Sequence, residues 1–195
     1  IMDIHEIARL NIKAIQTIQS DGPYQLCGHS FGSWVALEMA FQLQEAGHQV
    51  SQLIILDTGI PSEKDLSRIS NWDDCEWLIL VSKIIGDTYN KTLNLKLEEL
   101  RELNWEGQID LLFSEMKAND LIEDASGIEE VRSLVEMYKA QAQTMYTPRA
   151  LKVPNLALIR AKTLLDGFLD GMPAELQNDP FWGWGQFSQS MPRLE

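Results

Sequence analysis

Ser30 is the residue whose surroundings most clearly predict chemistry. It stands between Gly28 and Gly32 in the stretch "LCGHSFGSW" (26–34), after a short apolar run and before a helical pattern. A G-x-S-x-G string at such a junction is typical of a nucleophilic serine on a sharp turn, where strained backbone lifts the hydroxyl above the sheet. We expect Gly28 and Gly32 to be required because strand and helix approach closely there and leave no room for a Cβ.

The backbone N–H of Phe31 follows the serine and lies at the start of the expected helix. Amides at a helix N-terminus have no partner within the helix and favour negative charge. We therefore predict that this N–H donates to the oxyanion that forms when Ser30 attacks a carbonyl carbon.

Asp57 is the first candidate for an acid that acts with Ser30. It ends the apolar run "LIILD", and the carboxyl ends of parallel strands meet at one edge of a sheet. The alternative interpretation is an ordinary aspartate that opens the turn "DTGIP". Asp166, which follows the later strand pattern "NLALIRAK" after several residues, ranks second as the acid.

The chain holds three histidines, and none suits the role of general base. His29 adjoins Ser30 at the elbow, so we expect its side chain to point away from the hydroxyl. His48 precedes the next strand, and about seven strand residues place it roughly 20 Å from the chemistry. His5 lies at the correct edge, but on the polar side of its helix, where a solvated residue is the default expectation. The chain order Ser, Asp, His places the histidine after Asp57, and none follows it.

The elements that must position these residues alternate between helix and strand. The predicted order is a helix over 3–19, a strand over 24–28, a helix over 31–46, a strand over 49–57 and, much later, a strand over 152–162. Asp3 and Glu6 predict a variant capping box. The consecutive apolar residues Leu53 to Leu56 are typical of a strand covered on both faces. This alternation predicts an α/β fold with a parallel sheet.

The chain changes character between 62 and 150, where no strand pattern occurs. Amphipathic helical patterns occupy 75–86, 96–118 and 127–146. We therefore predict two core segments, 1–61 and 151–195, interrupted by a helical lid insertion over 62–150. Its apolar side chains, such as Trp77 and Leu112, are expected chiefly to pack the lid helices against one another.

Composition argues against several classes of function. The 195 residues include 16 Lys and Arg against 29 Asp and Glu, a formal net charge of −13. Binding to nucleic acid or to an anionic membrane requires clustered cations, so neither partner is expected. We find no membrane-spanning run, no signal peptide and no metal-ligand set. The two cysteines lie far apart; Cys27 is expected to be a small core residue, and the protein to be cytoplasmic without disulfides.

The segment 22–61 resembles the thioesterase domain that ends nonribosomal peptide synthetase and polyketide synthase assembly lines. The matching features are G-x-S-F-G, the aliphatic "ALEMA" helix and the aspartate of "LDT". The helical block resembles the lid of such enzymes, and "WGWG" (182–185) resembles the segment before their final strand and histidine loop. The resemblance implies a partial α/β-hydrolase fold. It departs from the family because the first strands and the catalytic histidine are missing, so we expect truncation at both ends.

The resemblance implies thioester chemistry on an acyl or peptidyl chain. The substrate would be carried by the phosphopantetheine arm of a carrier domain, upstream in the same polypeptide, with no other cofactor. Ser30 would attack the thioester after giving its proton to a histidine outside the chain, and Asp57 would orient that histidine. The amide of Phe31, with a second amide from a preceding loop, would hold the oxyanion. Water or a nucleophile of the substrate would then release the acyl-enzyme by hydrolysis or cyclisation.

Two alternatives stay open. One is a stand-alone α/β-hydrolase, such as an editing thioesterase, an esterase or a lipase. The other is a non-catalytic module, which the missing base favours. We expect these residues alone to have little or no thioesterase activity, and the strand at 24–28 to be an unpaired, aggregation-prone sheet edge.

Overall fold

The structure of the protein is a computed structural model, which describes residues 3–60, 71–122, 127–162 and 174–195. The chain divides into two compact units. The sheet unit comprises Ile1–Arg68 and Thr144–Glu195, and the helical unit comprises Ile69–Gln143. The helical unit falls within the predicted insertion over 62–150. Its role as a lid stays a prediction.

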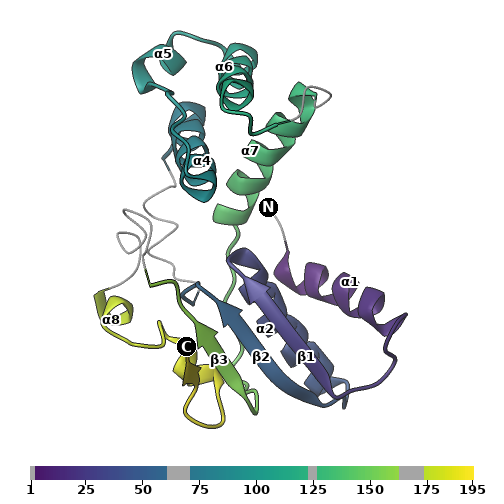
Figure 1. The fold of residues 1–195 in the computed structure, drawn as a ribbon. Helices are drawn as coiled ribbons and strands as arrows, with labels where there is room; N and C mark the ends of the chain where they lie inside the picture. The colour runs from purple at the N-terminus through teal and green to yellow at the C-terminus, as the bar shows by residue number, and fades with distance from the viewer. Residues whose placement is uncertain (1–2, 61–70, 123–126, 163–173) are drawn as a thin grey trace. The chain divides into compact units, whose positions relative to one another are not determined.

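The sheet unit is built on a parallel sheet, which confirms the predicted α/β class (Figure 1). The strands, which lie in the order β1-β2-β3-β4, are β1 (Tyr24–His29), β2 (Val50–Leu56), β3 (Leu156–Ile159) and β4 (Arg193–Leu194). In the described part of the chain, β1 is an edge strand, as expected. The register pairs His29 with Leu56, so β1 and β2 end side by side at the carboxyl edge.

Two helices form a layer beside the sheet. Helix α2 (Phe31–Glu45) packs against β1 and β2, and α1 (Ile4–Gln16) packs against α2. Because α2 lies between a sheet and another helix, it is apolar nearly all round, and Phe41 is completely buried. Gly47 follows α2 with φ of 85°, a left-handed conformation that suits glycine after a helix.

The predicted capping box at the start of α1 is only half formed. Asp3 caps the helix by accepting a hydrogen bond from the His5 N–H at 2.9 Å. Glu6 pairs instead with Arg9 one turn further along the helix. The reciprocal bond of a capping box is therefore replaced by an ion pair on the helix surface.

The prediction that Cys27 belongs to the core was wrong. Burial alternates along β1, and Cys27 lies on the exposed face together with Gln25 and His29. Ile54 and Leu56 of β2 are half-buried rather than buried. The physical reason is that the layer of α1 and α2 covers one face of these strands, while the described residues leave the other face of β1 open.

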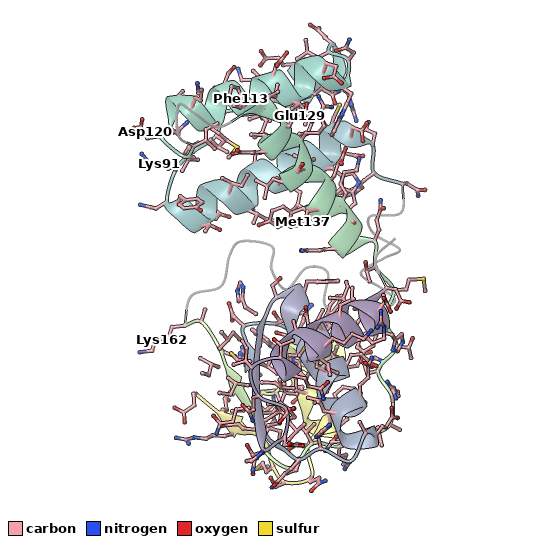
Figure 2. All side chains as sticks on the ribbon, turned by 90° about the vertical axis from the view of Figure 1, so that its right-hand side faces the viewer. Lys91, Phe113, Asp120, Glu129, Met137 and Lys162 are labelled. Atoms are coloured by element: carbon pink, nitrogen blue, oxygen red, sulfur yellow. The ribbon has the colours of Figure 1, made fainter. Side chains whose placement is uncertain are left out.

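The helical unit holds a hydrophobic cluster of its own. Its helices are α4 (Asp74–Tyr89), α5 (Leu97–Arg101), α6 (Trp105–Ala118) and α7 (Ile128–Ala142). The single helical stretch expected over 96–118 is divided, because Asn104 caps α6 by accepting from the Gly107 N–H. Leu112 is buried in the cluster and Trp77 is 1% exposed, as expected of residues that pack helices together. Figure 2 shows Glu129 and Met137 along α7.

The C-terminal segment returns to the sheet unit. It contains α8 (Ala174–Gln177) and the 3-10 helix η1 (Trp184–Phe187). Trp182 and Trp184 are completely buried in the same core as α2. Among the described residues, no helix combines the length and apolar character needed to cross a membrane.

Candidate active site

Ser30 joins β1 to α2 in a strained backbone conformation. Its φ of 51° and ψ of −131° lie outside the regions that residues with a side chain ordinarily adopt. Serine is a favoured helix N-cap, yet the Ser30 hydroxyl makes no capping hydrogen bond, and the residue is exposed. The turn therefore presents this hydroxyl outward instead of using it to close the helix.

Gly28 is required by a close approach of backbones at this turn. A Cβ at Gly28 would lie 2.4 Å from the Gly32 carbonyl oxygen and 2.5 Å from the Ser33 Cα. The expectation that Gly32 leaves no room for a Cβ was wrong, since a Cβ at Gly32 would meet nothing within 4 Å. The crowding is one-sided: the backbone of Gly32 fills the space beside Gly28, whereas the hydrogens of Gly32 face open space.

Phe31 is the first residue of α2, directly after Ser30. Its N–H belongs to the first turn, whose amides lack partners within the helix and carry the positive end of the helix dipole. Its ring packs against Trp34, with the ring centroids 5.9 Å apart. The predicted oxyanion role of the Phe31 amide stays a prediction, and its position beside the serine is compatible with it.

Asp57 directly follows β2 and is held by two hydrogen bonds. Its N–H donates to the Ile159 carbonyl at 2.8 Å, and its Oδ1 accepts from the Ala161 N–H at 2.9 Å. Because β1 and β2 end in register, Ser30 and Asp57 lie at the same edge of adjacent strands, which are about 4.8 Å apart in such sheets. The alternative acid, Asp166, lies outside the described residues.

Two of the histidines lie where the sequence indicates. His29 is the exposed last residue of β1. The ring of His48 packs against Tyr24 at the amino end of β1, with centroids 5.7 Å apart, and its Nε2 lies 3.3 Å from the Gln16 Nε2. His48 is therefore at the edge of the sheet opposite to Ser30.

His5 is exposed, as expected, with 55% of its side chain accessible to solvent, but it also contacts a buried group. Its Nδ1 lies 2.9 Å from the Oε1 of Glu38, a carboxylate that is completely buried on α2. Glu38 also accepts hydrogen bonds from Gln42 at 2.8 Å and from the Tyr146 hydroxyl at 3.0 Å, and it forms an ion pair with Arg149. His5 is thus a structural partner of Glu38.

The environment of Glu38 keeps it ionised. Burial by itself would raise the pKa of this carboxyl, but the hydrogen bonds from Gln42, His5, Arg149 and Tyr146 outweigh it and lower the pKa. The same burial, reinforced by the charge of Glu38, raises the pKa of the Tyr146 hydroxyl. Sequence reasoning missed this cluster, although a single acid within the aliphatic "ALEMA" helix is a signal for it.

The described residues contain no group of three or more His, Cys, Asp and Glu side chains that could hold a metal ion.

Comparison with known sequences places this site in a family context. The family described as the thioesterase domain matches residues 1–147. The indigoidine synthase of Dickeya dadantii is 38% identical over 105 residues, which cover 51% of this chain and 7% of that protein. The vanchrobactin synthetase VabF of Vibrio anguillarum is 31% identical over 168 residues, which cover 85% of this chain and 5% of that protein. The chain thus spans a small part of these relatives.

Comparison with solved structures supports the same fold. Holo-AB3403 is a four-domain nonribosomal peptide synthetase bound to AMP and glycine. Its structure matches this protein with a TM-score of 0.82 and 27% sequence identity, and the match covers 98% of this chain and 14% of the synthetase chain. The Vlm2 thioesterase domain matches with a TM-score of 0.57 and 17% identity, and SrfTE, the thioesterase domain that cyclises surfactin, with 0.51 and 16%. This chain covers 66% and 62% of those two domains. Their likeness confirms the α/β-hydrolase fold.

Proposed function

Because the chain belongs to the thioesterase domain family, we propose that it supplies the nucleophile and the acid of a serine thioesterase. The substrate class is an acyl or peptidyl thioester on the phosphopantetheine arm of a carrier domain in the same polypeptide. One observation carries the proposal. Ser30 is exposed on a strained turn, makes no capping hydrogen bond, and shares its sheet edge with Asp57.

In the proposed reaction, the Ser30 Oγ attacks the thioester carbonyl carbon. The C–S bond breaks, the serine proton passes through a base to the departing thiolate, and an acyl-enzyme remains. The Phe31 N–H, at the positive end of α2, stabilises the oxyanion. Water or a nucleophile of the substrate then attacks the ester and releases an acid or a ring.

The base in this mechanism is a histidine outside these 195 residues. His5 is engaged with Glu38, and His48 packs beside Tyr24 at the opposite edge. Asp57 Oδ1 accepts from the Ala161 amide, so its second carboxylate oxygen is the one proposed to orient the imidazole.

A cysteine variant tests the nucleophile without requiring the base. Ser30→Cys places a thiol on the strained turn, and a thiol exchanges with thioesters without general-base assistance. The reagent is an acyl N-acetylcysteamine thioester, and intact and peptide mass spectrometry locates the acyl group. We expect acylation at position 30 at least about tenfold faster than at Cys27, an exposed thiol that serves as the control within the same molecule.

Acylation no faster than that of Cys27 would overturn the assignment of Ser30. A second measurement tests the base. We expect the unaltered chain to turn over the thioester no faster than its Ser30→Ala variant. Turnover that Ser30→Ala abolishes would instead place the base within these residues.

The non-catalytic module is a second candidate, favoured by the engagement of His5 and the placement of His48. It predicts that even the Ser30→Cys thiol reacts like an ordinary exposed thiol, so the same experiment separates the two.

A further inference from the structure

The three residues that follow Asp57 each hydrogen-bond to a tryptophan. The Thr58 carbonyl accepts from the Trp184 Nε1–H at 2.5 Å, the Gly59 carbonyl accepts from the Trp34 Nε1–H at 3.1 Å, and the Ile60 N–H donates to the Trp182 carbonyl at 3.1 Å. The indole N–H can only donate a hydrogen bond, so each of these two indoles binds one backbone carbonyl of the loop. The loop after Asp57 is therefore held by two indole side chains and one backbone carbonyl from distant parts of the sequence.

Trp34 connects this loop to the helix that begins at the nucleophile. It lies one turn after Ser30 on α2, it is half-buried, and its indole is braced by the Phe31 ring. The hydrogen bond to Gly59 joins α2 to a residue two positions after Asp57. A rigid helix thus carries both the Ser30 turn and the donor that locates the Asp57 loop.

Asp57 has an uncommon backbone conformation. Its φ of 49° is positive, which is unusual for a residue other than glycine, although aspartate and asparagine adopt it more readily than most. The bonds to Ile159 and Ala161 hold Asp57 from the side of β3. Trp34 holds the same loop from the side of α2, so the carboxylate is located from both directions.

We propose that Trp34 is a positioning residue, whose indole N–H keeps the Asp57 carboxylate at working distance from residue 30. The inference deepens the proposed function and rests on it for its purpose. It predicts a geometry, however, that is measurable without turnover. Trp34 acts through the backbone of the Asp57 loop, while Trp184, completely buried, anchors that loop from the core.

The test measures how strongly the charge of Asp57 shifts the pKa of a thiol introduced at position 30. In the chain with Ser30→Cys, the pKa of the introduced thiol is obtained from its alkylation rate by iodoacetamide as a function of pH, followed by peptide mass. A nearby carboxylate disfavours the thiolate, so adding Asp57→Asn should lower this pKa by about 0.5. With Trp34→Phe, which keeps an aromatic ring but removes the N–H, we expect Asp57→Asn to change the pKa by no more than about 0.2.

A tryptophan of the helical unit provides the matched control. Trp105→Phe makes the same chemical change on α6, and the effect of Asp57→Asn should stay at about 0.5. An effect of Asp57→Asn that is the same with and without Trp34→Phe overturns the inference. No effect in either background overturns the placement of Asp57 and the inference together. A failure of the thioester reaction alone, with the coupling intact, would count against the proposed function and leave the inference standing.

A second measurement keeps the inference testable if the Trp34→Phe variant fails to fold, because it uses the unaltered chain. In the unaltered chain, the Trp34 indole N–H should exchange with solvent at least about tenfold more slowly than a free indole, because it is held by Gly59. Exchange at the rate of free indole overturns the inference whatever the variants do.

Discussion

The Ser33 hydroxyl donates a 2.8 Å hydrogen bond to the Gly28 carbonyl, which joins the end of β1 directly to the first turn of α2. Both residues are buried, and their backbones lie too close for a Cβ at Gly28. The turn that presents Ser30 is therefore stabilised by the close packing of Gly28 against Gly32 and Ser33, and by a hydrogen bond that does not involve Ser30 itself.

Gly28→Ala should destabilise the protein strongly. The new Cβ would lie within 2.6 Å of three backbone atoms of Gly32 and Ser33, and backbone cannot give way cheaply. We expect the free energy of unfolding, measured by urea denaturation, to fall by about 2–4 kcal/mol.

Gly32→Ala is the matched control for that change, since its Cβ would meet nothing within 4 Å. Gly32 lies in the first turn of α2, where alanine is the better helix former. The free energy of unfolding should stay the same or rise, by up to about 1 kcal/mol. Equal losses in both glycine variants would contradict the one-sided crowding.

Ser30→Gly should be more stable than Ser30→Ala. Both changes remove the hydroxyl, so their difference reports the backbone conformation at φ of 51°. Relief of strain is worth about 1–3 kcal/mol, and the greater freedom of glycine in the unfolded chain takes back about 0.5–1 kcal/mol. We expect the melting temperature to be several degrees higher for Ser30→Gly. An alanine variant at least as stable as the glycine variant would show that the turn is not strained.

Glu38→Ala should lower the free energy of unfolding by about 3–5 kcal/mol, because it leaves a buried cluster of donors without its carboxylate. Glu45→Ala is the control. Glu45 pairs with the same Arg149, but its side chain is 50% exposed, so we expect a loss below about 1 kcal/mol. Similar losses for the two variants, measured by urea denaturation, would argue against the importance of burial here.

Acid should weaken the fold through the same carboxylate. The pKa of Glu38 is lowered in the folded protein from its ordinary value of 4.5. Its contribution is therefore complete above about pH 4.5 and is lost as the pH falls through the lower, folded value. The charged and titratable groups that face it are His5, Tyr146 and Arg149.

The measurement is the free energy of unfolding between pH 7 and pH 3, compared with Glu38→Gln. The variant cannot titrate at this position, so its stability should fall less steeply below pH 5. Parallel curves for the two proteins would show that Glu38 does not contribute to acid sensitivity.

The sequence by itself determined the order of the first elements, from α1 to β2, and the turn at Ser30. The glycine at position 28 and the aspartate after the run "LIILD" can be predicted because they depend on local backbone geometry and on the periodicity of neighbouring residues. The three strands predicted from these patterns all form, and Asp57 follows its strand at the expected edge.

Tertiary structure alone decided which faces are covered and which distant groups meet. Periodicity divides β1 into two faces but cannot say that Cys27 lies on the open one, since this depends on where helices pack. The bond from Trp34 to Gly59 and the contact of His5 with buried Glu38 join residues far apart in the chain. Such contacts are set by packing of the whole unit, which leaves no repeat or spacing in the sequence from which to predict them.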